Sequence, residues 1–255
     1  MSQQPPSSRC AWITGGGGGI GAALALRLAA DGWRVAVSAR SADKLATVAA
    51  AAQAGAIVPY PLDVTDAAAV ADVATRIEQD FGGLDLAVLN AGTHTPMGVA
   101  DFSAATARAL MDVNYMGVVH GLAALLPAFT ARRRGQIAVV ASVAGWRGLP
   151  TAAAYGPTKA ALINLCESLR PECRRAGVDL RLICPGFVAT PLTARNDFPM
   201  PDLITAERAA DEIMRGLAGR RFEIAFPWRF VSALRLARRL PYRLYFALTE
   251  RMLSR

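Results

Sequence analysis

The sequence predicts one α/β domain built on a doubly wound parallel sheet, followed by a short helical extension at the C-terminus. Short apolar runs alternate with longer helical stretches along the 255 residues, which is typical of strand–helix–strand units. The apolar runs carry little polar alternation, as expected for strands that are covered on both faces. The apolar fraction of 53% is high enough to bury a large core. We place the domain at residues 1–226 and the extension at residues 227–255.

Strands and helices alternate in a regular order up to residue 226. We predict strands at residues 10–14, 35–38, 57–60, 84–90, 136–142, 179–184 and 222–226. We predict helices at residues 20–30, 42–54, 67–80, within 104–133 and at 153–176. Pro171 falls inside the last of these helices, where an interior proline costs about 3 kcal/mol, so we expect a kink or a break there. A mobile substrate lid is expected at about residues 190–205, before a helix that Thr205 caps.

Composition and charge narrow the function classes. The formal net charge is +8, and residues 215–255 alone sum to that value with ten arginines against two acids, so the basic character belongs to the tail. The first residues lack a basic stretch followed by an apolar one, and no run of about 18 uninterrupted apolar residues occurs, so we expect a cytoplasmic protein without a signal peptide or a spanning helix. No metal site is expected, since the only histidines are His94 and His120, which we predict to be structural. Small buried thiols are expected at Cys10, Cys166, Cys173 and Cys184.

A glycine-rich turn follows the first strand and opens a helix. Glycine lets the chain turn tightly and lets backbone N–H groups approach a pyrophosphate, and the helix N-terminus adds a favourable dipole. The alternative is a flexible loop without a ligand, which is less favourable because five consecutive glycines cost conformational entropy. The candidate cofactor-binding residues in this turn are Thr14, Gly15, Gly17, Gly18, Gly19, Ile20 and Gly21.

The ends of the next strands indicate which dinucleotide is bound. No acid occurs at residues 38–40 to bind a ribose 2′-hydroxyl, whereas Arg40 is suited to pair with a 2′-phosphate, so NADP is favoured over NAD. The alternative for Arg40 is an exposed arginine at the start of a loop. Asp63, followed by Val64, is a candidate to bind the adenine amino group or to cap the next helix, although Asp66 is the better N-cap. Small residues that let adenosine approach the backbone follow the fourth strand at Asn90, Ala91 and Gly92.

Tyr155 and Lys159 form the candidate catalytic pair. Residues four apart share a helical face, and a nearby ammonium favours the phenolate, so we expect Lys159 to lower the pKa of Tyr155. The chain has only two lysines, which argues against a chance placement of one of them four residues after a tyrosine. Ser142 ends the preceding strand, where its hydroxyl is suited to polarise a carbonyl or simply to cap a turn. Asn114 lies inside a helix and is therefore either exposed or bonded to a specific partner.

These motifs, in this order from residue 9 to residue 191, resemble the short-chain dehydrogenase/reductase family and its Rossmann-like fold. The resemblance implies that Tyr155 exchanges a proton, that Lys159 also holds the nicotinamide ribose, and that Ser142 orients the carbonyl. It implies a water relay through Asn114 to Lys159, and homodimers or homotetramers formed by the long helix after residue 92 and the Tyr155–Lys159 helix. A departure from the family is the glycines at 16–18, where small polar residues are usual. Further cofactor contacts are implied for Pro185, Gly186, Val188 and Thr190.

The tail mixes arginines with large apolar residues in two predicted helices, at residues 231–240 and 242–253. A hairpin packed on the domain or on a partner subunit is one interpretation, and a basic amphipathic anchor on an anionic membrane is the other. Nucleic-acid binding is not expected, because no known module is visible. An apolar tail near the site would suit a bulky hydrophobic substrate.

The sequence therefore predicts an NADP(H)-dependent oxidoreductase that transfers a hydride between nicotinamide and a small-molecule carbonyl or secondary alcohol. The alternative is a catalytically idle NADP-binding scaffold, or a membrane-surface protein that acts through its basic tail.

Overall fold

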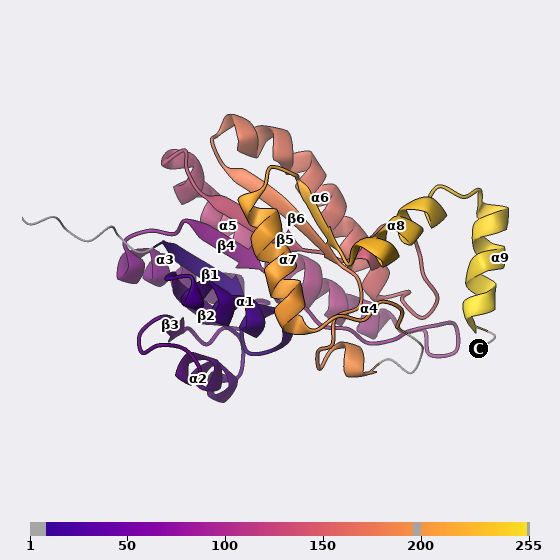
Figure 1. The fold of residues 1–255 in the computed structure, drawn as a ribbon, viewed down its shortest axis with the longest axis horizontal. Helices are drawn as coiled ribbons and strands as arrows, with labels where there is room; N and C mark the ends of the chain where they lie inside the picture. Colours follow the sequence, from indigo (N-terminus) through magenta and orange to yellow (C-terminus); the bar gives the residue numbers. More distant parts are fainter. Residues whose placement is uncertain (1–8, 196–199, 254–255) are drawn as a thin grey trace, which may run out of the picture.

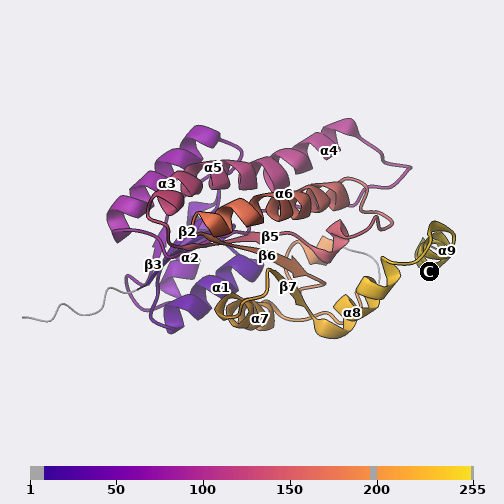
Figure 2. The same ribbon diagram turned by 90° about the horizontal axis from the view of Figure 1, so that it is seen from above.

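The computed structural model describes residues 9–195 and 200–253, which form a parallel sheet covered by helices on both faces (Figures 1 and 2). The strand order is β3-β2-β1-β4-β5-β6-β7, and every neighbouring pair is parallel. The order reverses between β1 and β4, which is where such sheets bind ligands. The predicted fold class is confirmed. The strands are β1 (Cys10–Thr14), β2 (Arg34–Ser38), β3 (Ile57–Pro59), β4 (Leu86–Leu89), β5 (Gln136–Val140), β6 (Asp179–Pro185) and β7 (Glu223–Phe226).

Two groups of helices sandwich the sheet, and each group buries its own apolar cluster against it. Figure 2 shows the first group on one side of the sheet and the second group on the other. The first group is α1 (Gly19–Ala30), α2 (Ala42–Ala50) and α7 (Ala206–Ala218). The second group is α3 (Ala67–Phe81), α4 (Ala104–Met111), α5 (Gly117–Ala131) and α6 (Tyr155–Arg175). Short helical turns occur at Asp112–Met116, Val143–Gly145 and Thr193–Arg195.

The element boundaries agree with the sequence pattern except at a few positions. Asp66 and Thr205 cap α3 and α7, as predicted. Of the kink or break predicted at Pro171, the break is wrong, because α6 continues through this residue to Arg175. Pro171 lies on the exposed side, while Cys166 and Cys173 on either side of it are buried against the sheet. That packing outweighs the local cost of the proline. The last strand begins one residue later than predicted.

The helical run from Ala104 to Ala131 is long and apolar enough to cross a bilayer by length and composition alone. In the fold it is one of the helices that cover the sheet, and a π-helical turn at Asp112–Met116 divides it. Leu122, Leu125 and Phe129 on its inner face are buried in the core. A core helix passes the same length and hydropathy test.

Two helices follow β7 and form the C-terminal extension: α8 (Trp228–Ala237) and α9 (Tyr242–Leu253). Figures 1 and 2 show α9 projecting beyond the carboxyl ends of the strands. The prediction of two short helices is confirmed, although α8 begins three residues earlier than expected. The predicted lid includes residues 196–199, which lie outside the described residues.

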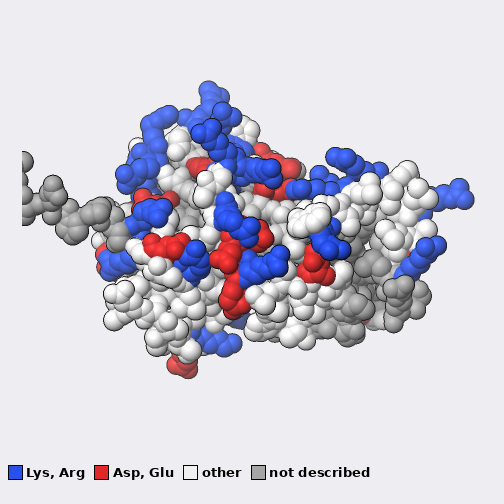
Figure 3. Space-filling view, in the orientation of Figure 1, with Lys and Arg blue, Asp and Glu red and all other residues white. Residues whose placement is uncertain are grey.

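The arginines of the tail segment do not lie together in space. Arg220 and Arg221 precede β7 at the amino ends of the strands, on the side of the molecule opposite to α9. There the Arg181 guanidinium donates to the Arg221 carbonyl. Figure 3 shows Lys and Arg gathered over this end of the molecule, where α6 ends. The expectation that the tail holds the basic character is therefore corrected. The exposed arginines of this basal patch are Arg133, Arg134, Arg174, Arg175, Arg220 and Arg221.

Candidate functional site

The ends of β1 and β4 are tied together where the strand order reverses. The Thr14 hydroxyl accepts hydrogen bonds from the backbone N–H groups of Asn90 at 3.0 Å and Ala91 at 3.1 Å. The Asn90 side-chain amide in turn donates to the carbonyls of Thr14 at 3.0 Å and Gly15 at 3.3 Å. Thus the glycine turn and the Asn90–Gly92 motif, which lie far apart in the sequence, form one rigid edge.

The glycine turn has the shape that a pyrophosphate requires. Gly15 has φ +69°, and a Cβ there would lie 2.8 Å from Asn90 Nδ2 and 2.9 Å from Ala91 Cα. A Cβ on Gly18 would meet nothing within 4 Å, so this glycine borders open space. Gly18 is the N-cap of α1, and among the described residues no side chain caps that helix. Its first amide groups therefore lack a side-chain acceptor and can bind an anion, and Ile20 and Gly21 follow in the first turn.

Arg40 and Asp63 lie near each other beyond β2 and β3. Arg40 is exposed, and the pKa of Asp63 is lowered by hydrogen bonds from Thr65 and, less strongly, by the positive charge of Arg40. Asp63 does not cap a helix, because its carboxylate accepts from Thr65 N at 3.0 Å and Thr65 Oγ1 at 2.8 Å. Val64 is buried, and its carbonyl lies 2.9 Å from His120 Nδ1, which gives that histidine the structural role we predicted.

Lys44 is a second cation at this rim, which sequence reasoning did not assign to the site. A Cβ on Gly17 would lie 3.3 Å from Lys44 Cβ, so the lysine side chain begins beside the glycine turn. Its side chain is exposed, as is that of Arg40. The signal in the sequence was the position of Lys44, on the first turn of α2 and four residues after Arg40. Ser41 caps this helix, with its Oγ 3.4 Å from the Lys44 backbone N. Both cations are thus available to a 2′-phosphate.

Ser142, Tyr155 and Lys159 meet at the carboxyl ends of β5 and β6. Tyr155 is the first residue of α6, two residues after the predicted helix start, and Lys159 follows one turn later with its Nζ 5.6 Å from the Tyr155 ring centroid. Lys159 is buried and donates to the Val140 carbonyl at 2.9 Å. The Ser142 hydroxyl accepts from Ala144 N at 3.1 Å and donates to the Pro185 carbonyl at 3.4 Å. Ser142 therefore does cap a turn, and its hydroxyl is close enough to Tyr155 to act on the pKa of that tyrosine.

Burial controls the protonation of both members of the Tyr155–Lys159 pair. It raises the pKa of Tyr155 to about 12, against the lowering effect of the Ser142 hydrogen bond. Burial also lowers the pKa of Lys159 to about 8. We expected Lys159 to lower the pKa of Tyr155, whereas the pKa of Tyr155 is raised. The physical reason is that withdrawal from water penalises both charged forms, the phenolate and the ammonium.

Asn114 is bonded to specific partners, which is the second of the two alternatives that its place inside a helix left open. It is fully buried in the π-helical turn, and its Oδ1 accepts from Thr93 N at 2.7 Å. Its Nδ2 donates to the Thr93 carbonyl at 2.9 Å and to Thr158 Oγ1 at 3.1 Å. A Cβ on Gly92 would lie 3.3 Å from Asn114 Oδ1 and 3.6 Å from Lys159 Nζ. Asn114 thus connects the β4 edge to α6; the water relay stays a prediction.

The segment after β6 reaches back to the glycine turn. A Cβ on Gly19 would lie 3.0 Å from Thr190 Cγ2, so Thr190 lies against the start of α1. Thr193 Oγ1 donates to the Val188 carbonyl at 2.6 Å and fixes this turn. Gly186, which follows Pro185, packs against the start of the extension, since a Cβ there would lie 2.8 Å from the Phe230 ring. The segment that carries Val188 and Thr190 therefore lies beside the glycine turn, and the cofactor contacts of its four predicted residues stay a prediction.

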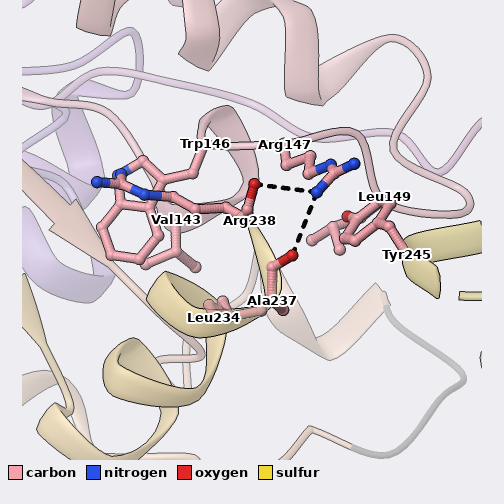
Figure 4. A pocket seen from close by; sticks show the side chains of 8 residues that line it. All are labelled: Val143, Trp146, Arg147, Leu149, Leu234, Ala237, Arg238 and Tyr245. Carbon is pink, nitrogen blue, oxygen red and sulfur yellow. Dashed lines mark hydrogen bonds between the residues drawn. The ribbon is translucent and has the colours of Figure 1, made fainter. Parts of the chain in front are cut away.

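Two residues beside the site escaped sequence reasoning. His94 is buried with its ring centroid 4.8 Å from that of Tyr155, in an edge arrangement, although we predicted it to be structural. Its position two residues after Gly92 was the available signal. Arg147, five residues after Ser142, lines a small cavity between the site and the extension together with Trp146, Leu234 and Tyr245 (Figure 4).

Comparisons with known proteins agree with this geometry. A family model described as short chain dehydrogenase matches residues 9–198. A relative from Myxococcus xanthus, known only as an uncharacterized oxidoreductase, is 38% identical over 248 residues, covering 96% of this chain and 98% of its own length. A short chain dehydrogenase/reductase from Burkholderia phymatum, solved in complex with NAD, has a TM-score of 0.82 at 27% identity, with 91% and 93% of the two chains covered. A short chain dehydrogenase from Burkholderia cenocepacia, solved in complex with NADP, has the same TM-score and identity over 97% and 98%.

Proposed function

Because the chain belongs to the short-chain dehydrogenase family, we propose that it transfers a hydride between NADP and a carbonyl or secondary alcohol. Membership makes it an oxidoreductase, and its structural relatives bind NAD or NADP. The observation that carries the proposal is the meeting of Ser142, Tyr155 and Lys159 beside an uncapped, glycine-rich helix start. A binding protein has no need of a hydrogen-bonded tyrosine and a buried lysine at that place.

The roles of the residues follow from their chemistry. A bound nicotinamide supplies the hydride for reduction or accepts it in oxidation. Ser142 donates a hydrogen bond to the substrate oxygen, and Tyr155 gives that oxygen its proton in reduction. A tyrosine pKa raised to about 12 keeps the phenol protonated at neutral pH, which suits the reducing direction. Lys159 binds the nicotinamide ribose. Asn114 fixes two segments of the site, because its side chain bonds the Thr93 backbone and the Thr158 hydroxyl, and Thr158 precedes Lys159.

NADP preference is part of this proposal. Arg40 and Lys44 present two cations near the ribose end of the site, and cations paired with phosphate oxygens form strong charge-assisted hydrogen bonds. The adenine end is assigned to Asp63 and Val64, and the carboxamide end to Val188 and Thr190. We further propose a homodimer or homotetramer built on α4, α5 and α6. The substrate is a small carbonyl or alcohol compound of hydrophobic character.

The test separates binding from turnover. Fluorescence titration with NADPH and NADH should show tighter binding of NADPH. The double variant Arg40→Gln and Lys44→Gln should remove that preference by weakening NADPH binding tenfold or more. A lost charge-assisted hydrogen bond costs about 1.5 kcal/mol or more, which corresponds to this loss of affinity. NADH affinity should not change. Equal affinity for both cofactors in the unmodified chain would overturn the NADP assignment and leave the oxidoreductase assignment standing.

Tyr155→Phe tests the chemistry. We expect turnover of a reducible carbonyl to fall by about 10²–10⁴-fold, because a positioned acid contributes that much, while NADPH affinity is retained. Tyr60→Phe is the control: it also removes one phenolic hydroxyl, and the hydroxyl of the buried Tyr60 bonds Asp80 at 2.6 Å, away from the site. Undiminished turnover in a folded Tyr155→Phe protein would refute the catalytic role.

A further inference from the structure

The C-terminal extension leaves most of its large apolar side chains in contact with water. Trp228 is 72% exposed, Leu236 is 68% exposed and Tyr242 is 71% exposed. On α9, three more apolar side chains are exposed, at Leu244, Phe246 and Leu248. Single exposed apolar residues are ordinary, but a cluster of this size on one small element indicates an interaction surface.

The domain covers only the middle of the apolar face of α9. Among residues 242–251 of α9, the buried ones are Tyr245 and Thr249, one turn apart. At about 100° per residue, Tyr242 and Phe246 lie on one side of this line, and Leu244 and Leu248 lie on the other. Tyr242 and Phe246 stack on each other with ring centroids 5.5 Å apart. The apolar side chains of α9 therefore span about 200° of the helix circumference, roughly twice the 100° stripe with which a helix packs on a domain.

Arginines surround this apolar surface almost without acids. Residues 228–253 contain six arginines and one acid, Glu250. Arg235 is neutralised by Glu223 of β7 at 2.7 Å, and Arg229, Arg239 and Arg243 are exposed. Exposed aromatic and aliphatic groups combined with arginines are the composition of helices that lie in the interface of an anionic bilayer.

The extension is held in a fixed position. The Arg147 guanidinium donates to the carbonyls of Ala237, Arg238 and Leu240, where α8 ends. The Tyr245 hydroxyl donates to the Gly148 carbonyl at 2.6 Å. The loop that precedes α4 reaches toward the same end of the molecule in both views, and it carries Val99 at 97% and Phe102 at 69% exposure (Figures 1 and 2). A flat apolar partner can therefore touch several elements at once.

From these observations we propose that the extension docks the protein on an anionic lipid surface. The exposed side chains of α8 and α9 insert among the lipid headgroups, and the arginines pair with lipid phosphates. The end of the sheet that carries Ser142 and Tyr155 then lies close to the bilayer. This proposal is independent of the proposed reaction.

Charge argues for lipid over a second copy of the chain. Pairing two extensions would bring arginines against arginines, with Glu250 as the one acid that each copy offers in residues 228–253. Like charges placed face to face oppose association, whereas an anionic bilayer complements all of the free cations of the extension. The basal patch is also basic, but it lies at the opposite end of the molecule and lacks the exposed aromatic residues, so it provides a charge-matched control.

The experiment is sedimentation of the full chain with vesicles of phosphatidylcholine, with and without phosphatidylglycerol. We expect binding to the anionic vesicles alone, weakened by high salt. Arg239→Gln with Arg243→Gln should weaken binding about 30-fold, at about 1 kcal/mol per cation near the surface. The control, Arg220→Gln with Arg221→Gln, removes the same charge from the basal patch and should change binding less than about twofold. Equal weakening by the two pairs would overturn the proposal, because net charge alone would then explain binding.

A second variant tests the apolar contribution at constant charge. Leu244→Ser, Phe246→Ser and Leu248→Ser together should weaken vesicle binding at least about tenfold, because they remove buried apolar area from the bound state. These side chains are exposed, so the fold is expected to remain intact, and unchanged NADPH affinity checks that. Sedimentation velocity of the unmodified chain and of the same variants tests the competing explanation, which is that a second copy of the chain covers this surface. A change of oligomeric state, with no vesicle binding by the unmodified chain, would overturn the proposal in favour of self-association.

Discussion

The guanidinium carbon of Arg147 lies 3.8 Å from the ring centroid of Tyr245 and joins the C-terminal extension to the loop after Ser142. The same guanidinium lies 5.0 Å from the Tyr242 ring and donates to three carbonyls where α8 ends. One half-buried side chain thereby satisfies the free carbonyls of a helix end and stacks on two aromatic rings. The position of α9 depends on a residue almost one hundred positions earlier in the sequence.

Replacing Arg147 should loosen the extension without unfolding the domain. Arg147→Met keeps the length of the side chain but loses the donors, and hydrogen bonds of a charged group contribute about 1.5–3 kcal/mol. We expect faster amide hydrogen exchange in residues 242–251. The slower exchange of the core strands β1, β4 and β5 should not change. Arg229→Met, an exposed arginine in the first turn of α8, is the control and should leave exchange in α9 as it is. Equal protection of α9 in both variants would contradict the role given to Arg147.

Asn114 and Thr158 should be coupled energetically. Asn114→Ala leaves the Thr93 N–H and carbonyl without their partner, and each buried unsatisfied group costs about 1–3 kcal/mol. Thr158→Val removes the acceptor of the 3.1 Å bond from Asn114 Nδ2. We expect a coupling free energy of about 0.5–3 kcal/mol in a double-mutant cycle measured by urea denaturation. Strictly additive effects would show that this bond contributes nothing to stability.

Gly15 and Gly18 should respond differently to the same substitution. Gly15→Ala puts a side chain at φ +69° and into contact with Asn90, so we expect a loss of at least about 2 kcal/mol of stability. At Gly18 the backbone is extended and the added methyl meets no neighbour within 4 Å. Gly18→Ala should keep the melting temperature and weaken NADPH binding, since the methyl enters the space assigned to the pyrophosphate. Thermal melts and fluorescence titration of both variants provide the comparison, and a stable Gly15→Ala protein would contradict it.

The buried Lys159 should make stability depend on pH. Burial lowers its pKa from 10.5 to about 8, so the charged form destabilises the folded state at neutral pH. Between pH 8 and pH 10.5 the unfolded chain still holds the proton that the folded chain has lost, so the contribution of Lys159 to the free energy of unfolding rises with pH across this window. The full effect is on the order of 3 kcal/mol.

Lys159→Met removes this titrating group, so the free energy of unfolding of the unmodified protein should rise with pH relative to that of the variant. Urea denaturation of both proteins between neutral pH and pH 10.0 measures this difference. The buried thiols and Tyr155, whose raised pKa values act in the opposite direction, are present in both proteins and cancel in the comparison. Lys44→Met is the control, since Lys44 is exposed. A rise of equal slope in the unmodified protein and in Lys159→Met would show that Lys159 is charged in the folded state throughout.

Much of the site could be predicted because its chemistry is local in sequence. The glycine turn, the Asn90–Gly92 motif and the four-residue spacing of Tyr155 and Lys159 each lie on one strand end or one helix turn. Their convergence follows from the rule that parallel strands end at one edge of a sheet. Lys44 and His94 escaped prediction because neither belongs to a spaced motif, and nearness in the sequence to Arg40 or Gly92 does not by itself show a contact. The fold alone brings Lys44 beside Gly17 and His94 against Tyr155.

The sequence by itself determined the parallel sheet, the order of its elements and the strand ends that carry the chemistry, because hydrophobic period and glycine placement act locally. Only the tertiary structure decided the direction of the pKa shifts of Tyr155 and Lys159, because burial depends on what packs around a group. It also decided that α6 continues through Pro171, since packing of the whole helix outweighs one lost hydrogen bond. Finally, it divided the arginines of the tail between the basal patch and the extension. Distance in space sets charge interactions, and β7 carries the chain from one end of the sheet to the other.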